Sequence, residues 1–495
     1  MAQIEIKDLS FFYDGSYDMI FDHVSFRFDT DWKLGFTGRN GRGKTTFCRL
    51  LMGELPYRGK ISAPVKFDYF PFPIPDFSQL GREILAQVCP EAQDWQVERE
   101  LSLLGVDEAT LSRPFSTLSN GEQTKLMLAG LFLRENEFLL IDEPTNHLDM
   151  AGRQTVSRYL KSKEGFLLIS HDRVFLDGCV DHILSINKNS IEITKGNFST
   201  WLYNKELRDQ FELAENEKLG REIKRLQNTA REKAGWADKA ESRKIGFDPS
   251  QTEKSMGRRP YEAAKSKKTM QRAKAIEARR QNTIEKKTAL LKDVERAMPL
   301  KLSPLSYRAE KLIECRDLSV DYGGGPVCAG VSFTLCRGDR LALRGGNGSG
   351  KSSILKLLCG EEIPYSGELR IGGGLVISHI PQDTSHLSGG MREYAKAQGI
   401  DESLFKAILH DLDFSKELYD KELSCLSAGQ KKKVLIASSL CTPAHLYVWD
   451  EPLNYIDVIS RMQIEQLLAE YAPTLLFVEH DAAFCEHIAT KVVDI

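Results

Sequence analysis

Two short runs of consecutive apolar residues, far apart in the chain, each end in an acidic pair. Residues 138–141 (Phe-Leu-Leu-Ile) run into Asp142 and Glu143, and residues 446–449 (Leu-Tyr-Val-Trp) run into Asp450 and Glu451. Apolar runs of this length are typical of parallel strands buried on both faces, and the residue after such a strand lies at its carboxyl end, where α/β sheets bind ligands. The pattern predicts two α/β sheets, each with carboxylates at a ligand-binding edge.

A different pattern fills the middle of the chain. Apolar residues recur mostly three, four or eight positions apart over residues 202–232 and again over 262–295, as on one face of a helix. They are Leu207, Phe211, Leu219, Ile223 and Leu226, then Ile276, Ile284, Leu291 and Val294. We expect two antiparallel helices of about 30 residues, each roughly 45 Å long. The helix breakers between them predict a tip loop over about 233–261; these are Gly235, Gly246, Pro249, Gly257 and Pro260.

Two glycine-rich segments follow one pattern, with their lysines 307 residues apart. The first is Gly38-Arg39-Asn40-Gly41-Arg42-Gly43-Lys44-Thr45-Thr46, and the second is Gly345-Gly346-Asn347-Gly348-Ser349-Gly350-Lys351-Ser352-Ser353. Both match the P-loop, in which backbone N–H groups at a helix N-terminus surround phosphates. The lysine reaches the β- and γ-phosphates, and the first hydroxyl residue after it joins Mg²⁺. Each segment therefore predicts a site for a nucleotide and Mg²⁺.

The motifs after each P-loop come in the same order. A Leu-Ser-x-Gly sequence, here called the signature loop, follows each P-loop. Its serine lies 75 residues after the P-loop lysine in one half (Lys44 to Ser119) and 76 in the other (Lys351 to Ser427). The acidic pairs follow, and then His171 and His480. The halves are a tandem repeat that resembles the ATPase domains of the ABC superfamily. The resemblance implies an α/β fold with two tandem ABC-type P-loop ATPase domains, 1–200 and 306–495, joined by a basic helical hairpin linker over 201–305.

The resemblance also implies a role for each motif residue. Glu143 and Glu451 would polarise the attacking water, and His171 and His480 would contact the γ-phosphate. Magnesium would be held by Thr45, Asp142, Ser352, Asp450 and Gln382. Tyr13 and Tyr322, which precede the P-loop lysines by 31 and 29 residues, would stack on adenine. The signature loops would complete the site of the opposite half, with Ser427, Gly429 and Gln430 meeting the first P-loop and Ser119 and Gly121 meeting the second.

Two positions depart from the family pattern. Phe72 stands where the second half has Gln382, and a phenylalanine cannot ligate Mg²⁺. Either the first site couples differently from the second, or a water replaces the amide with little effect; both interpretations stay open. His171 and His480 are the switch histidines of the family pattern. Glu479 stands before His480 where the family usually has serine, and nothing in the sequence accounts for it.

Charge and composition narrow the function further. Residues 201–300 hold 25 Lys and Arg against 16 Asp and Glu, a surplus of nine positive charges. Because the whole chain has a net charge of −3, the other 395 residues carry a net charge of −12. A basic helical ridge suits a phosphate backbone with little sequence readout, as in the binding of A-form RNA, although a solvated helix face is the alternative.

No apolar run approaches the roughly 18 residues of a membrane span, and the N-terminus lacks the features of a signal peptide. The ten cysteines lie singly, without a Cys-x-x-Cys pair, which fits a reducing compartment. We expect a cytoplasmic protein.

Within the ABC superfamily, the chain resembles the ABC-F family of ribosome-binding ATPases, on its two ATPase halves, its basic hairpin linker and Gly196-Asn197-Phe198-Ser199 before the first linker helix. Three stretches are similar to the Lsa-like antibiotic-resistance branch: Trp32-Lys33-Leu34-Gly35, Phe211-Glu212-Leu213-Ala214-Glu215-Asn216-Glu217 and Trp449-Asp450-Glu451-Pro452-Leu453-Asn454-Tyr455.

The resemblance implies ATP and Mg²⁺ as cofactors, ATP hydrolysis, and binding to rRNA and peptidyl-tRNA on the exit-site side of the ribosome. It also implies protection from lincosamide, pleuromutilin and streptogramin A antibiotics. We expect a monomer whose halves pair within the chain, with no membrane or DNA partner. A translation factor without a resistance role and a transporter ATPase subunit are the alternatives.

Overall fold

The computed structural model describes residues 2–13, 19–134, 137–146, 148–186, 191–245, 300–323 and 325–495. The chain divides into two compact units, of which one comprises Met1–Trp201 with Ala297–Ile495 and the other comprises Leu202–Arg296. The first unit contains both halves of the tandem repeat.

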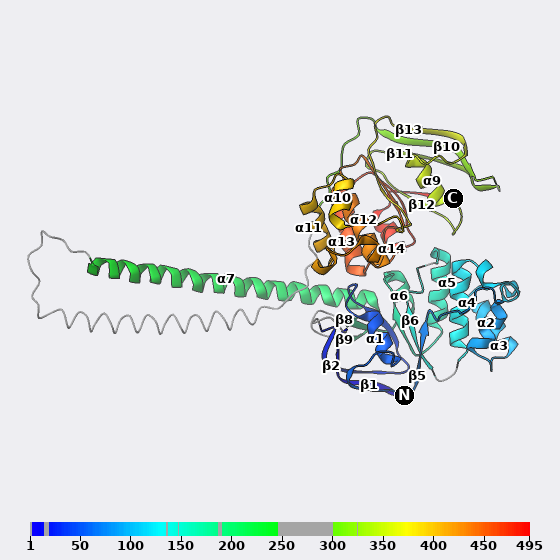
Figure 1. Ribbon diagram of the computed structural model, residues 1–495, viewed down its shortest axis with the longest axis horizontal. Coiled ribbons are helices and arrows are strands. Elements are labelled where there is room, and N and C mark those ends of the chain that lie inside the picture. Colours follow the sequence, from blue (N-terminus) through cyan, green and yellow to red (C-terminus); the bar gives the residue numbers. More distant parts are fainter. Residues whose placement is uncertain are drawn as a thin grey trace, which may run out of the picture. The chain divides into compact units, whose positions relative to one another are not determined.

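The first half is built on a six-stranded sheet and a three-stranded antiparallel sheet (Figure 1). In the larger sheet the order is β5 (Lys66–Phe70), β6 (Glu137–Asp142), β7 (Phe166–Ile169), β3 (Lys33–Thr37), β8 (His182–Ile186) and β9 (Ile191–Lys195), with only β9 antiparallel to its neighbour. The smaller sheet has the order β2 (Phe21–Asp29), β1 (Gln3–Phe11) and β4 (Arg58–Ser62). The helices are α1 (Lys44–Leu51), α2 (Gly81–Val88), α3 (Asp94–Leu103), α4 (Asn120–Phe132), α5 (Met150–Lys161) and α6 (Arg173–Cys179).

The second half repeats this plan. Its parallel sheet has the order β14 (Ile377–Ile380), β15 (Leu446–Asp450), β16 (Leu475–Val478), β12 (Arg340–Arg344) and β17 (Lys491–Asp494). Its antiparallel sheet has the order β11 (Pro326–Cys336), β10 (Lys311–Asp321) and β13 (Tyr365–Ile371). The helices are α9 (Lys351–Leu358), α10 (Met391–Ala397), α11 (Glu402–Asp411), α12 (Ala428–Cys441), α13 (Val458–Tyr471) and α14 (Ala482–Ile488).

The apolar runs form buried strands, as predicted. Residues 138–141 of β6 and all five residues of β15 are buried. In the first half, one core joins Ile6 of β1, Phe36 of β3, Phe47 of α1 and Leu140 of β6. The core therefore holds the P-loop helix α1 between the two sheets, with its N-terminus at the edge where β6 ends in Asp142. The prediction of two α/β domains is confirmed.

The linker begins with one long helix, α7 (Phe198–Ile245), of 48 residues (Figure 1). The sequence pattern predicted that the tip loop would begin at about residue 233, and this boundary is wrong because α7 continues through residues 233–245. A glycine inside a helix costs only about 1 kcal/mol relative to alanine. Gly235 lies among Ala, Lys, Glu and Arg residues that favour helix, and they outweigh it. The rest of the expected loop and the second linker helix fall at 246–299, outside the described residues.

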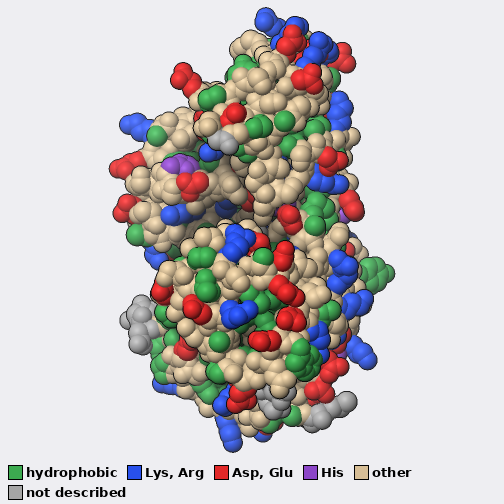
Figure 2. Space-filling view, turned by 90° about the vertical axis from the view of Figure 1, so that its right-hand side faces the viewer, with side chains coloured by type: hydrophobic (Ala, Val, Ile, Leu, Met, Phe, Trp, Pro, Cys, Tyr) green, Lys and Arg blue, Asp and Glu red, His purple; other side chains and the backbone are tan. Residues whose placement is uncertain are grey.

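The surface of the protein mixes charges of both signs on the face shown in Figure 2, where Lys and Arg side chains lie among Asp and Glu side chains. Among the described residues, no helix combines the length and the apolar character needed to cross a membrane.

Candidate active sites

Each P-loop turns into its helix through a glycine in the left-handed region. Gly43 has φ of 90° before α1, and Gly350 has φ of 88° before α9. A Cβ at Gly43 would lie 2.5 Å from the side chain of Ile20, so a larger residue would not fit. The lysine that follows folds back over its loop, since Lys44 Nζ donates to Gly38 O at 2.7 Å. Lys351 Nζ likewise donates to Gly346 O at 2.7 Å.

The predicted magnesium ligands of the first half lie together. Thr45 Oγ1 donates to Asp142 Oδ2 at 2.8 Å, and the hydroxyl of Tyr69 donates to the same oxygen at 2.8 Å. In the second half, Asp450 Oδ1 is buried and has no hydrogen-bond partner among the described residues. Burial raises the pKa of Asp450, while the Ser352 side chain opposes this shift. Hydroxyl and carboxylate oxygens of this kind fit Mg²⁺, which prefers oxygen ligands.

The glutamates after the two strands share an uncommon backbone conformation. Glu143 has φ of 50° and Glu451 has φ of 46°. Their N–H groups donate across the sheet, Glu143 N to Ile169 O at 2.9 Å and Glu451 N to Val478 O at 3.0 Å. Non-glycine residues with positive φ are often found at functional sites, because the surrounding structure must hold them there.

The switch histidines lie beside these glutamates. His171 Nε2 is 3.3 Å from Glu143 Oε1, and His480 Nε2 is 3.4 Å from Glu451 Oε1. His171 Nε2 is also 3.1 Å from Asn40 Oδ1 of the first P-loop. The structure thus brings together the residues predicted to act on the γ-phosphate.

The two glutamates differ in their surroundings. Burial, helped by Asp142, raises the pKa of Glu143 to about 8. Burial also acts on Glu451, but His480 and the Gln382 amide outweigh it and lower the pKa of Glu451. Gln382 Nε2 and Asn454 Nδ2 both donate to Glu451 Oε2, at 2.9 and 2.7 Å. Gln382, predicted as a magnesium ligand, is hydrogen-bonded here to the glutamate, and its binding to magnesium remains a prediction.

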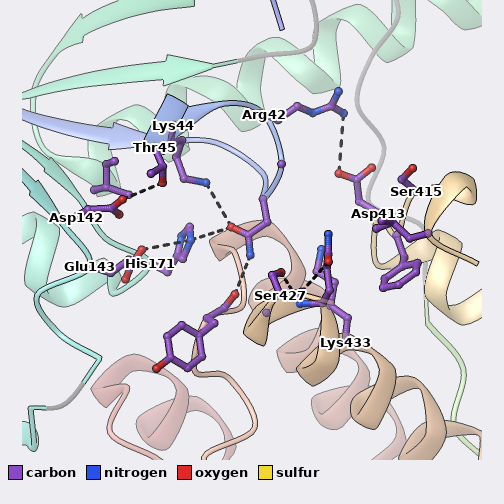
Figure 3. A pocket seen from close by; sticks show the side chains of 18 residues that line it. Arg42, Lys44, Thr45, Asp142, Glu143, His171, Asp413, Ser415, Ser427 and Lys433 are labelled. Atoms are coloured by element: carbon purple, nitrogen blue, oxygen red, sulfur yellow. Dashed lines mark hydrogen bonds and ion pairs between the residues drawn. The ribbon is translucent and has the colours of Figure 1, made fainter. Parts of the chain in front are cut away.

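The first site is a cavity of about 490 Å³ lined by both halves (Figure 3). Lys44, Thr45, Asp142, Glu143 and His171 line it together with Ser427, Gly429 and Gln430. Ser427 caps the N-terminus of α12, where its Oγ accepts from Gln430 N at 3.4 Å. A helix N-terminus favours anions. Space for a phosphate group is thus lined by the P-loop of one half and the signature helix of the other.

A hydrogen bond and a close approach join the halves in the wall of this cavity. Asn40 Nδ2 donates to the Tyr455 carbonyl at 2.8 Å. A Cβ at Gly429 would lie 2.6 Å from that carbonyl and 3.4 Å from Asn40 Nδ2. Only glycine at 429 therefore allows this close approach.

The second site is a cavity of about 500 Å³ with the mirrored composition. Lys351, Ser352, Gln382, Glu451 and His480 line it with Ser119 of the first half. Asn120 lines it as well, whereas Gly121 and Asp450 are not among its wall residues. The head-to-tail pairing predicted from the signature loops is the arrangement seen in both cavities.

The two tyrosines expected beside adenine take matching positions. The Tyr13 hydroxyl is 3.0 Å from Thr46 Oγ1, and the Tyr322 hydroxyl donates to Ser353 Oγ at 3.0 Å. Both rings are largely exposed and lie against the first turn of a P-loop helix, outside the walls of the two cavities. Stacking on adenine remains a prediction.

Sequence reasoning missed two lysines that follow Gln430 in α12. Lys433 lines the first cavity, with its Nζ 3.1 Å from Asp457 Oδ2, and Lys432 lines the second cavity and donates to the Pro381 carbonyl at 3.0 Å. The signal was available, because adjacent helix residues point about 100° apart and a pair next to a signature motif can face two sites.

Glu479, which the sequence left unexplained, has a structural role. Its Oε1 accepts the N–H of Leu453 at 2.7 Å. At the same place in the first half, the hydroxyls of Thr145 and Ser170 lie 3.3 Å apart. Since Leu453 has no hydroxyl, the longer glutamate reaches the backbone N–H in its place.

A comparison with known families agrees with this geometry. The model for "ABC transporter" matches residues 21–146 and 328–454. The chain belongs to the ABC transporter family. Domains of this family bind ATP with Mg²⁺ and hydrolyse it.

Individual relatives match nearly the whole chain. It is 28% identical to the ribosome protection protein VmlR of Bacillus subtilis, over 94% of this chain and 82% of that protein. It is 24% identical to the energy-dependent translational throttle protein EttA of Haemophilus influenzae, over 96% and 89%. With two ABC domains in one chain, it is a tandem ABC ATPase of the ABC-F type.

Solved structures share the fold. The archaeal ribosome recycling factor aABCE1, in complex with the ribosomal stalk protein aP1, gives a TM-score of 0.65 at 19% identity, over 98% of this chain and 87% of that chain. A structure titled RNase-L Inhibitor gives 0.61 at 20% identity, over 99% and 87%. At these identities the likeness shows a tandem ABC fold.

Proposed function

We propose that this chain is a cytoplasmic ATPase that binds the ribosome and protects it from antibiotics of the peptidyl-transferase centre. The observation that carries the proposal is similarity to the ribosome protection protein VmlR along 94% of the chain. Lincosamides, pleuromutilins and streptogramin A compounds are the drugs proposed.

The two cavities support an ATP-driven closing of the halves. Each has a P-loop lysine from one half and a signature serine from the other, so one nucleotide contacts both halves. Magnesium, when bound, would neutralise charge on the phosphates. Glu143 and Glu451 would polarise the attacking water, and His171 and His480, which lie 3.3 and 3.4 Å from these glutamates, would contact the γ-phosphate as it develops charge. Cleavage removes the link between the halves and lets them part.

The linker supports a nucleic-acid partner. Helix α7 spans 48 residues, so it is roughly 70 Å long at 1.5 Å per residue. The segment 201–300 carries a surplus of nine basic residues. We propose that it reaches rRNA and peptidyl-tRNA on the exit-site side and displaces the drug through the tRNA.

A translation factor without a resistance role is the second candidate, favoured by the similarity to the translational throttle protein EttA. Drug susceptibility separates the two functions, because only a protecting protein raises tolerance. A transporter subunit would leave the basic linker unexplained.

The test is expression in a drug-sensitive bacterium, with growth scored against lincomycin, tiamulin and a streptogramin A. The double variant Glu143→Gln, Glu451→Gln is compared with the matched surface change Glu54→Gln, Glu362→Gln, which alters two exposed glutamates. We expect the wild type and the surface variant to raise tolerance and the active-site variant to lose it. Unchanged tolerance despite ribosome binding would move the function to a translation factor.

Ribosome binding itself is measured by co-sedimentation with ATP. The active-site double variant closes on ATP without cleaving it, so it should stay on ribosomes after the wild type has left. Absence of the wild type from ribosomes under all nucleotide conditions contradicts the proposed function.

A further inference from the structure

Charged contacts between the two halves gather at the first site. Arg173 of α6 pairs with Glu465 of α13, and the two side chains are only 12% and 10% exposed. Arg39 and Arg42 of the first P-loop approach Asp413 of the second half, at 3.7 and 3.9 Å. Figure 3 shows the Arg42–Asp413 contact at the rim of the cavity. We call these two groups of residues the ionic braces.

The repeat allows the same positions to be examined at the second site. Counted from the switch histidines, Arg173 corresponds to Ala482, and counted from Asp149 and Asp457, Glu465 corresponds to Ser157. Thus neither partner of this brace has a charged counterpart.

The P-loop brace is also missing its counterparts. By P-loop alignment, Arg39 and Arg42 correspond to Gly346 and Ser349. Asp413 lies 14 residues before its signature serine, as Gly105 does in the first half. The main chain is alike at both places, with φ of 58° at Asp413 and 61° at Gly105, so the sites differ in charge and not in fold.

A cavity takes the place of the Arg173–Glu465 brace at the second site. It measures about 370 Å³ and is lined by Ser157 and Ala482, with His480 in its wall. Arg153 pairs with Asp172 of its own half at 2.8 Å, and across the interface it donates to a neutral group, the carbonyl of His480, at 3.2 Å. His480 of the second site therefore borders this cavity, among whose lining residues no charged pair joins the halves; Asp172 and Val174, which follow His171, border it too, but Arg173 between them pairs with Glu465 of the opposite half.

The catalytic residues differ in the same sense. Two amides, from Gln382 and Asn454, hold Glu451 in the second site. In the first half, Phe72 replaces the glutamine and lies in the wall of a separate cavity with Met52 and Val88. The second site has the better-held glutamate and the weaker tie across the halves.

We propose that the two sites divide the work: the first retains its nucleotide and acts as the pivot between the halves, and the second performs most of the turnover and opens first. Opposite charges across a partly buried interface are poorly screened, so separating them slows opening on that side. This inference rests on ATP hydrolysis within the proposed function and is independent of ribosome binding.

The test follows release of a fluorescent N-methylanthraniloyl ATP after a chase with unlabelled ATP. The wild type should show a fast phase and a slow phase. Removing both braces with Arg173→Ala and Asp413→Asn should accelerate the slow phase by about fivefold, which corresponds to about 1 kcal/mol for the two braces together, and leave the fast phase unchanged. Asn suits position 413 because it tolerates the left-handed conformation.

A brace can also be added to the second site. Ser157→Glu with Ala482→Arg places the missing pair there and should slow the fast phase by about fivefold. Arg158→Ala, on an exposed residue of α5 that also lines this cavity, is the matched control and should change neither phase. The swap Arg173→Glu with Glu465→Arg rebuilds the ion pair with its charges exchanged. It should keep the slow phase near its wild-type rate, whereas general damage to the fold would accelerate it.

Steady-state hydrolysis assigns the phases to sites. Glu451→Gln should reduce ATP turnover at least fivefold more than Glu143→Gln does. Equal losses, or a slow phase that is indifferent to the braces, overturn the division of work. If the wild-type protein hydrolyses ATP but does not bind ribosomes, only the proposed ribosomal function is contradicted.

Discussion

The buried ion pair between Lys433 and Asp457 allows a sharp test of how the second half is stabilised. Lys433 Nζ lies 3.1 Å from Asp457 Oδ2, and the side chains are 3% and 0% exposed. The same ammonium donates to the Leu412 carbonyl at 2.6 Å. Lys433→Met keeps the length of the side chain and removes its charge, so that Asp457 is left buried without its cation.

The expected cost follows from this burial. Removing one partner of a buried ion pair typically costs about 3–5 kcal/mol, because the remaining charge is uncompensated. For a domain of this size, each kcal/mol lowers Tm by roughly 2–4 °C, which gives a drop of about 6–20 °C. The assay is thermal unfolding at neutral pH. Lys431→Met, two residues earlier and outside the pair, is the matched control and should change stability by less than about 0.5 kcal/mol.

The pH dependence gives a second readout. Burial opposes ionisation of Asp457, but Lys433 and the Ser460 N–H outweigh it and hold the pKa of Asp457 well below its usual value. A depressed pKa contributes stability above the unfolded pKa of about 3.8, and this is lost as the pH falls through the folded value. In Lys433→Met the carboxyl takes up a proton more readily, so the Tm difference from wild type should narrow towards pH 5. Adding Asp457→Asn should recover part of the loss. Equal Tm values for Lys433→Met and Lys431→Met would refute this reasoning.

Two further predictions concern one buried and one partly buried glutamate. Glu479→Ser removes the acceptor of the Leu453 N–H and should cost about 1–3 kcal/mol in urea unfolding, while adding Leu453→Thr should recover part by recreating the hydroxyl pair of Thr145 and Ser170; no recovery would contradict this role. Burial, with Asp68, raises the pKa of Glu137 to about 7, so its contribution to stability is present below the unfolded pKa of 4.5 and is lost as the pH rises through 7. Glu137→Gln should flatten the stability curve between those values, and an unchanged curve would show that another group titrates.

The parts of the sites that sequence predicted are those that local chain chemistry determines. A P-loop requires positive φ at particular glycines, and Gly43 and Gly350 adopt it. A buried parallel strand must end at the ligand-binding edge, so Asp142 and Asp450 follow from the apolar runs before them. The order of motifs carried the rest through family resemblance.

Contacts between distant segments could not be predicted in this way. Arg173 and Glu465 are 292 residues apart, and their pairing depends on how the two halves pack. Tyr69 donates a hydrogen bond to Asp142 in the half that has Phe72, which no spacing rule indicates. The sequence pattern ends the first linker helix too early, because the helix-forming neighbours of Gly235 outweigh the cost of one glycine inside α7.

The two repeats share their fold but differ in charge at their interface, and the reason is physical. A change at Gly43 or in β6 would alter the fold of one half, whereas Ala482 in place of an arginine leaves α14 intact and removes only a contact with the other half. Charges at the interface can therefore diverge without cost to either domain. Because both cavities are lined by residues of the two halves, a difference in charge there would, in our proposal, act directly on how each site opens. The asymmetry is thus most readily produced where it has the largest effect on the ATPase cycle.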